Sequence, residues 1–76
     1  MVVAYVMVKA NSGEADRIRS DIVALDGVVE ASIVAGDVDF IAKLDVASPA
    51  EVKNVAASGI QDIDGVEDTQ TYVAMD

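Results

Sequence analysis

The spacing of apolar residues changes several times along the chain and predicts four strands and two helices. Residues 2–9 are apolar on both alternating faces and rich in β-branched side chains, so they predict a central strand. Further strands are predicted at about 29–35, 39–46 and 67–75. A turn at 36–38 would join the second and third strands as a hairpin.

Two helices are predicted between these strands. The first would begin near Asn11 or Ser12, either of which can cap a helix, and would end at Asp26-Gly27. The second helix has a clearer start signal, Ser48-Pro49-Ala50-Glu51: a serine at the cap, a proline at the first helical position and a glutamate at the third. This helix would end near residue 62. The residues at helical spacing toward the sheet are Ile18, Ile22 and Leu25 in the first helix, and Val52, Val55, Ala56, Ile60 and Ile63 in the second.

The same pattern occurs twice, at an offset of 38 residues in a chain of 76. Leu25-Asp26-Gly27-Val28 recurs as Ile63-Asp64-Gly65-Val66, each time where a helix ends and a strand begins. Two strand–helix–strand units give a βαββαβ order, and right-handed crossovers put both helices on one face of the sheet. We therefore expect an α+β, ferredoxin-like single domain over residues 1–76, with an antiparallel sheet of strand order 4-1-3-2.

The face of the sheet opposite the helices would carry Val3, Tyr5 and Met7 from the first strand and Ile41 from the third. This surface is too apolar to stay hydrated, and 53% apolar residues are more than a small monomer can bury. We expect it to be a dimer interface that packs against the same face of a second copy. The protein would then be a homodimer or higher oligomer, a dimeric α-β plait.

Composition excludes several classes of function. Fourteen acidic residues against five basic ones give a net charge of −9, which argues against direct contact with nucleic acid. No stretch approaches the roughly 20 apolar residues of a membrane span, and the N-terminus lacks the basic start of a signal peptide. We therefore expect a cytoplasmic protein with no membrane partner.

The sequence has few of the residues on which catalysis and metal binding usually depend. The chain has no histidine or cysteine, so its serines lack a histidine base and no enzyme activity is expected. Asp62-Ile63-Asp64-Gly65 is similar to the start of a calcium loop, but its glycine stands at the fourth position rather than the sixth. No metal site and no cofactor are predicted.

The predicted hairpin turn Gly36-Asp37-Val38-Asp39 has two interpretations. Glycine and aspartate can simply supply the backbone angles and local hydrogen bonds of a turn. Alternatively, the carboxylates and free turn amides form a pocket for a small zwitterion.

Thr69 and Thr71 on the last strand also have two interpretations. They can be ordinary strand residues, or they can supply hydroxyl groups to a polar ligand at the rim of an oligomer. The candidate ligand-binding residues are Gly36, Asp37, Asp39, Thr69 and Thr71.

The combination GVVEASIVAGDVDFIAKLDV, SPAEV and IDGVEDTQTYV resembles the ligand-binding domain of the leucine-responsive (Lrp/AsnC) regulators over essentially the whole chain. Gly36 and Asp39 occupy the Gly-x-x-Asp places of that pattern, and Thr69 and Thr71 its last-strand places. The resemblance implies dimerisation through the sheets, assembly into larger rings, and binding of an amino-acid effector between dimers near the hairpin. Val38 stands where an aromatic is often found, which leaves the identity of the effector open.

The helix-turn-helix that usually precedes this domain is missing from the sequence. The resemblance therefore implies a stand-alone sensing domain, acting alone or by co-assembly with full-length Lrp/AsnC relatives. A ligand-free oligomerisation module is an alternative. Another is the ACT domain, a βαββαβ amino-acid binder whose ligand sits at the loop after the first strand, here Asn11-Ser12-Gly13.

Overall fold

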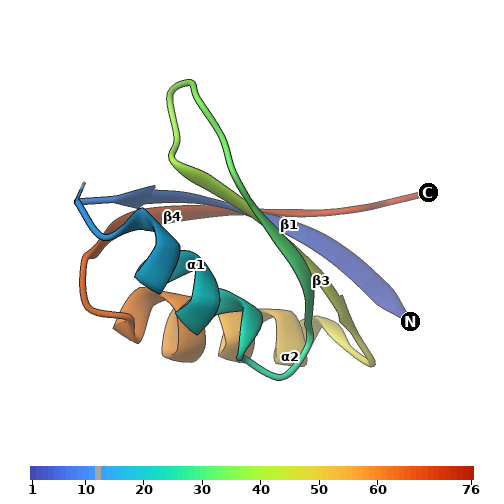
Figure 1. The fold of residues 1–76 in the computed structure, drawn as a ribbon. Helices are drawn as coiled ribbons and strands as arrows, with labels where there is room; N and C mark the ends of the chain where they lie inside the picture. The colour runs from blue at the N-terminus through green and yellow to red at the C-terminus, as the bar shows by residue number, and fades with distance from the viewer. Residues whose placement is uncertain (12) are drawn as a thin grey trace.

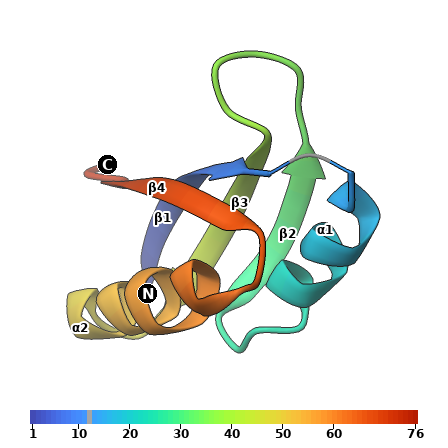
Figure 2. The same cartoon turned by 90° about the vertical axis from the view of Figure 1, so that its left-hand side faces the viewer.

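A computed structural model describes residues 1–11 and 13–76, so Ser12, one of the two proposed capping residues, lies outside the described part. The order of elements is β1 (Val2–Ala10), α1 (Ala15–Val23), β2 (Val28–Ile33), β3 (Phe40–Val46), α2 (Pro49–Lys53), η1 (Asn54–Gly59), η2 (Ile60–Asp62) and β4 (Val66–Val73). The strands form one antiparallel sheet of order β2-β3-β1-β4, and the helices lie together on one side of it (Figures 1 and 2). The predicted ferredoxin-like fold and strand order are confirmed.

The core lies between the sheet and the helices, and it contains the residues that periodicity assigned to it. Alternate residues of the central strands point toward the helices, whereas their neighbours point to the opposite face. The buried residues are Ala4, Val6, Val8, Ala31, Phe40, Ala42 and Leu44 from the strands, and Ile18, Ile22, Val52, Ala56 and Ile60 from the helices. Leu25, Val55 and Ile63 pack against them while partly exposed.

The start of α2 follows its sequence signal. The side chain of Ser48 accepts a hydrogen bond from the Glu51 N–H at 3.4 Å, and Pro49 is the first helical residue. The Glu51 carboxylate accepts from the Ala47 N–H at 2.7 Å, one residue before the position that it reaches in a standard capping box. The helical segment reaches Asp62 as predicted, but after Lys53 the α-helix gives way to the π-helical segment η1 and the 3₁₀ turn η2.

The start of α1 differs from the prediction. The helix begins at Ala15, with Glu14 at the cap position and no side-chain cap hydrogen bond, so Asn11 does not cap it. Arg17 instead ties this helix to the turn before β4, since its Nη2 donates to the Asp64 carbonyl at 2.7 Å. A hydrogen bond to Glu14 raises the pKa of Arg17, which keeps the guanidinium charged.

The two copies of the Asp-Gly turn both require glycine. Gly27 and Gly65 have φ values of +95° and +102°, where side chains are strained. A Cβ on Gly27 would lie 2.8 Å from Val46 Cγ1, and one on Gly65 would lie 3.0 Å from Ile18 Cδ1. The repeated motif therefore marks two places where backbone angle and close packing coincide.

We expect Gly27→Ala to lower the free energy of unfolding by about 1–3 kcal/mol, because it combines a strained φ with a steric clash. Gly36→Ala is the matched control: Gly36 lies outside the positive-φ region, and an added Cβ would meet no atom within 4 Å. Urea denaturation of both variants measures the difference. Equal losses of stability in the two would contradict this account of the turn.

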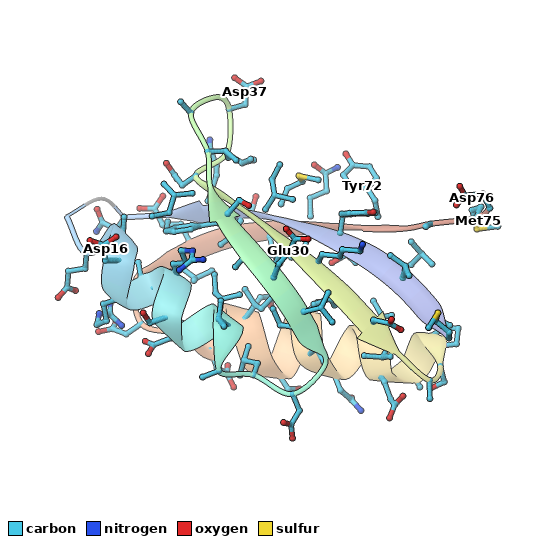
Figure 3. All side chains as sticks on the ribbon, turned by 45° about the vertical axis from the view of Figure 1, so that its right-hand side comes forward. Asp16, Glu30, Asp37, Tyr72, Met75 and Asp76 are labelled. Carbon is cyan, nitrogen blue, oxygen red and sulfur yellow. The ribbon has the colours of Figure 1, made fainter. Side chains whose placement is uncertain are left out.

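The face of the sheet away from the helices carries the predicted apolar residues, and Lys43 and Glu30 lie on it beside them, because Lys43 pairs with Tyr5 and Glu30 pairs with Lys43. Val3, Met7 and Ile41 are half-buried, whereas Tyr5 is 37% exposed. Tyr72 pairs with Tyr5 across β1 and β4, and its side chain points away from the helices (Figure 3). We call Val3, Tyr5, Met7, Ile41 and Tyr72 the outer face; that it is an interface stays a prediction.

Candidate functional site

The hairpin between β2 and β3 rises from the sheet on the side opposite the helices (Figure 1). Residues 34–39 lie outside both strands, so the connection is longer than the predicted turn at 36–38. Asp39 connects the base of the hairpin to β1. The N–H of Asp39 donates to the Val8 carbonyl at 2.9 Å, and Oδ2 of Asp39 accepts from the Ala10 N–H at 2.9 Å. Its carbonyl also accepts from the Val34 N–H at 2.9 Å, which closes the loop.

Turn chemistry explains only part of this hairpin. Asp39 makes the local hydrogen bonds that the turn interpretation requires. Gly36, however, has no positive φ and no close neighbour, so the idea that it supplies an unusual backbone angle was wrong. Asp37 is exposed at the tip of the loop (Figure 3). Its carboxylate is therefore available to a ligand or a second chain.

A hollow of about 210 Å³ lies beneath the hairpin, and we call it the hairpin hollow. Its lining consists of Met7, Lys9, Asp37, Val38, Asp68, Thr69 and Gln70. Its lining includes one basic residue, Lys9, and two acidic ones, Asp37 and Asp68, together with Met7 of the outer face. Charged groups of both signs suit a zwitterion, whose carboxylate and ammonium need opposite partners.

A second, smaller space of about 100 Å³ lies on the other side of the hairpin base, and we call it the turn cavity. Its lining consists of Ala10, Asn11, Gly13, Ala15, Ile33, Val34, Asp39 and Phe40. Asp39 comes from the hairpin, whereas Asn11 and Gly13 come from the segment between β1 and α1. The two loops that the sequence offered as alternative sites therefore border one cavity, and a shift of either loop would not by itself distinguish them.

The two threonines are not placed alike. Thr69 lines the hairpin hollow with Asp37, and its hydroxyl accepts a hydrogen bond from Gln61 Nε2 at 2.7 Å. Both threonines line a groove between β4 and α2, but Thr71 borders neither space at the hairpin. Thr69 thus lies near both Asp37 and Thr71, whereas Thr71 lies away from the hairpin.

Lys9 and Asp68 were not among the residues predicted for the site. They are paired in the register of β1 and β4, at the point where a bulge shifts that register. The antiparallel pairing of the first and last strands predicts that residues of these strands face one another, but the sequence does not show which residues pair.

Residues 1–11 and 13–76 contain no group of three or more carboxylates positioned to hold a metal ion. None of the helices found there has the length and apolar character needed to cross a membrane.

We expect Asp39→Ala to speed hydrogen exchange of the Ala10 amide and to cost about 0.5–1.5 kcal/mol of stability, because that N–H loses its acceptor. Asp39→Asn keeps an acceptor oxygen at the same place and is the matched control. Amide exchange followed by NMR makes the comparison. Unchanged protection of Ala10 in the alanine variant would show that the hydrogen bond does not hold the hairpin base.

The sequence profile of the family described as the Lrp/AsnC ligand binding domain matches residues 3–76. The leucine-responsive regulatory protein of Haemophilus influenzae is 30% identical over 76 residues, which are 100% of this chain and 46% of that protein. The chain thus spans about half the length of this curated relative.

Solved structures of other proteins share the fold of this chain. A protein of Thermus thermophilus superposes with a TM-score of 0.95 at 28% identity, covering 100% of this chain and 95% of that one. A transcriptional regulator from Neisseria meningitidis, solved as a complex with L-Met, superposes with a TM-score of 0.86 at 13% identity, covering 99% of this chain and 50% of that one.

Proposed function

The chain belongs to the Lrp/AsnC ligand binding domain family, and on that premise we propose that it is an effector-sensing module that binds a small molecule, most simply an amino acid, beside the hairpin. The observation that carries the proposal is the hairpin hollow, which gathers Lys9, Asp37 and Asp68 where the family resemblance predicts the effector. The complex of the Neisseria regulator with L-Met supports the choice of an amino acid.

Oligomerisation is the second part of the proposal. The outer face packs against the same face of another copy, because an exposed sheet with two tyrosines at its centre gains free energy when it is covered. Met7 belongs both to the outer face and to the hairpin hollow. A second copy on the outer face would therefore border the hollow, which places the effector at a seam between subunits.

Regulation follows from that placement. An effector at the seam binds one assembly better than another and so shifts the equilibrium between them. In the cytoplasm, the module would modulate transcription through its oligomeric state or by co-assembly with full-length Lrp/AsnC relatives, with no contact of its own to nucleic acid. The known members of the family are regulators rather than enzymes, and we assign no catalytic step.

Titration of the twenty amino acids, followed by calorimetry and by the amide signals of Gly36 to Asp39, tests the sensing role. We expect at least one to bind and to shift these signals. Lys9→Met should weaken binding about tenfold or more, because it removes a charge-assisted hydrogen bond. Lys53→Met on α2, which is also exposed but lies outside both spaces at the hairpin, is the control. If none of the twenty amino acids binds, the sensing role is contradicted and the ligand-free oligomerisation module is the interpretation that remains.

The outer face has its own test. Tyr5→Lys should reduce the mass in solution to that of a single chain, since it would bury a charge at the centre of the interface. Val23→Lys introduces the same charge at another exposed apolar residue, 42% exposed at the end of α1, and should leave the assembly intact. Light scattering after size exclusion measures both. A Tyr5 variant that stays associated would place the interface elsewhere.

A further inference from the structure

The outer edge of β4 is open to a further strand. β4 is the last strand of the sheet, and in the part of the chain that the structure describes it pairs with β1 alone (Figure 2). Ala74 donates its N–H to the Val3 carbonyl at 2.8 Å, and the direction of bonding alternates along an antiparallel pair. The N–H and C=O groups of Thr71 and Val73 therefore point away from β1, toward the open side.

Features that protect a sheet edge lie at the start of β4. The register shifts there at a bulge, and Asp68 Oδ1 accepts a hydrogen bond from the Thr69 N–H at 2.9 Å. Residues 70–73 include no lysine or proline, the residues that commonly prevent strand addition at an edge. At the opposite edge of the sheet, Arg19 donates to the Ala31 carbonyl. The part of β4 around Thr71 lacks protection of either kind.

The groove between β4 and the helical segments α2 and η1 follows this edge, and we call it the edge groove. Its volume is about 380 Å³. One wall consists of three alternate residues of β4, Thr69, Thr71 and Val73, and the other wall includes Val52 and Ala56. An extended peptide paired with β4 would place every second side chain between these walls. The edge thus offers backbone partners to such a peptide, and the edge groove offers room for its side chains.

The two ends of the edge groove differ in charge. At one end, Gln61 Nε2 donates to the Thr69 hydroxyl at 2.7 Å. Gln61 also borders a second space of about 180 Å³, whose lining includes Glu67 and Asp68. Lys53 lines the edge groove farther back along α2. A peptide with basic residues beside Glu67 and Asp68 would therefore be complementary in charge.

A second copy of the chain fits this edge poorly. β4 carries two carboxylates and no basic residue. An antiparallel pair of β4 strands centred on Thr71 would bring Glu67 of each copy beside Asp76 of the other, and like charges that face one another destabilise a strand pair. It would also join two chains that each carry a net charge of −9. Charge therefore favours a basic segment of another protein.

We propose that the β4 edge and the edge groove bind an extended, basic peptide segment of another protein, which adds a strand antiparallel to β4. Small or β-branched side chains at alternate positions lie in the edge groove, and lysine or arginine at the C-terminal end of the segment faces Glu67 and Asp68. The antiparallel direction matches the rest of the sheet and gives the stronger backbone pairing. Such binding requires neither an effector nor a dimer, so it goes beyond the proposed function.

Fluorescence anisotropy with the labelled peptide Val-Thr-Val-Thr-Val-Lys-Lys tests the proposal. In the antiparallel register, its valines face the edge groove and its lysines face Glu67 and Asp68. We expect binding, with shifted and exchange-protected amide signals of Thr71 and Val73. N-methylation of the third residue keeps every side chain but removes the N–H that pairs with Thr71, and should weaken binding about tenfold. The reversed order Lys-Lys-Val-Thr-Val-Thr-Val should weaken it about as much.

Variants of the protein separate backbone pairing from charge. Thr71→Pro removes the outward N–H at an edge position where proline is tolerated, and should weaken peptide binding about tenfold. Thr71→Ala keeps that N–H and is the control.

Glu67→Lys should weaken binding of the lysine peptide and strengthen binding of the same peptide ending in two glutamates. Asp16→Lys makes the same change of charge at an exposed residue in the first turn of α1 and should do neither.

Each result decides for or against strand addition. If the labelled peptide does not bind, or if the N-methylated or reversed peptide binds equally well, the proposal is overturned. It is also overturned if the protein forms dimers that Thr71→Pro dissociates and Tyr5→Lys does not, because the edge then holds a second copy. The amino-acid titration does not depend on any of these results, so the sensing function is judged separately.

Discussion

The structure depends on a sheet that is covered on one side only. A chain of 76 residues supplies enough helix for one layer, and that layer buries the alternate residues of the central strands almost completely. The remaining side of the same strands carries the outer face, whose tyrosines are more than a third exposed. Since apolar surface leaves water favourably, the obvious cover for this side is another protein surface.

The β2 edge of the sheet is less suitable for association than its open face. At the β2 edge, Arg19 reaches from α1 and donates from Nε to the Ala31 carbonyl at 2.8 Å. That contact occupies a backbone acceptor which another strand would need. We therefore expect association at the outer face, beside which Asp39 anchors the hairpin. The proposed ligand site and the proposed subunit interface are neighbours because one hairpin borders both.

Most of the fold could be predicted from the sequence because its signals are local and mutually consistent. The repeated Asp-Gly turn, the serine–proline start of α2 and the alternation in β1 each specify one element, and together they leave one topology. The π-helical winding after Lys53 could not be predicted in this way. Val52, Ala56 and Ile60 are four residues apart, a spacing that predicts a helix but does not distinguish an α from a π winding.

The candidate site was less predictable, because it depends on contacts between distant segments. The hairpin motif indicated Asp37 and Asp39 as candidates. It did not show that the Asp37 carboxylate is exposed at the tip of the loop, whereas the Asp39 carboxylate accepts a hydrogen bond from the Ala10 N–H. The contribution of Lys9 depends on the direction in which the hairpin rises. Such directions are set by packing between distant segments rather than by residue type.

Sedimentation equilibrium of the unaltered protein at micromolar concentration tests the central claim most directly. A sheet with one uncovered apolar face should give a mass of at least two chains, each of 7.9 kDa. A mass of one chain at every concentration would mean that water covers the outer face, and it would remove the seam at which the effector is proposed to bind.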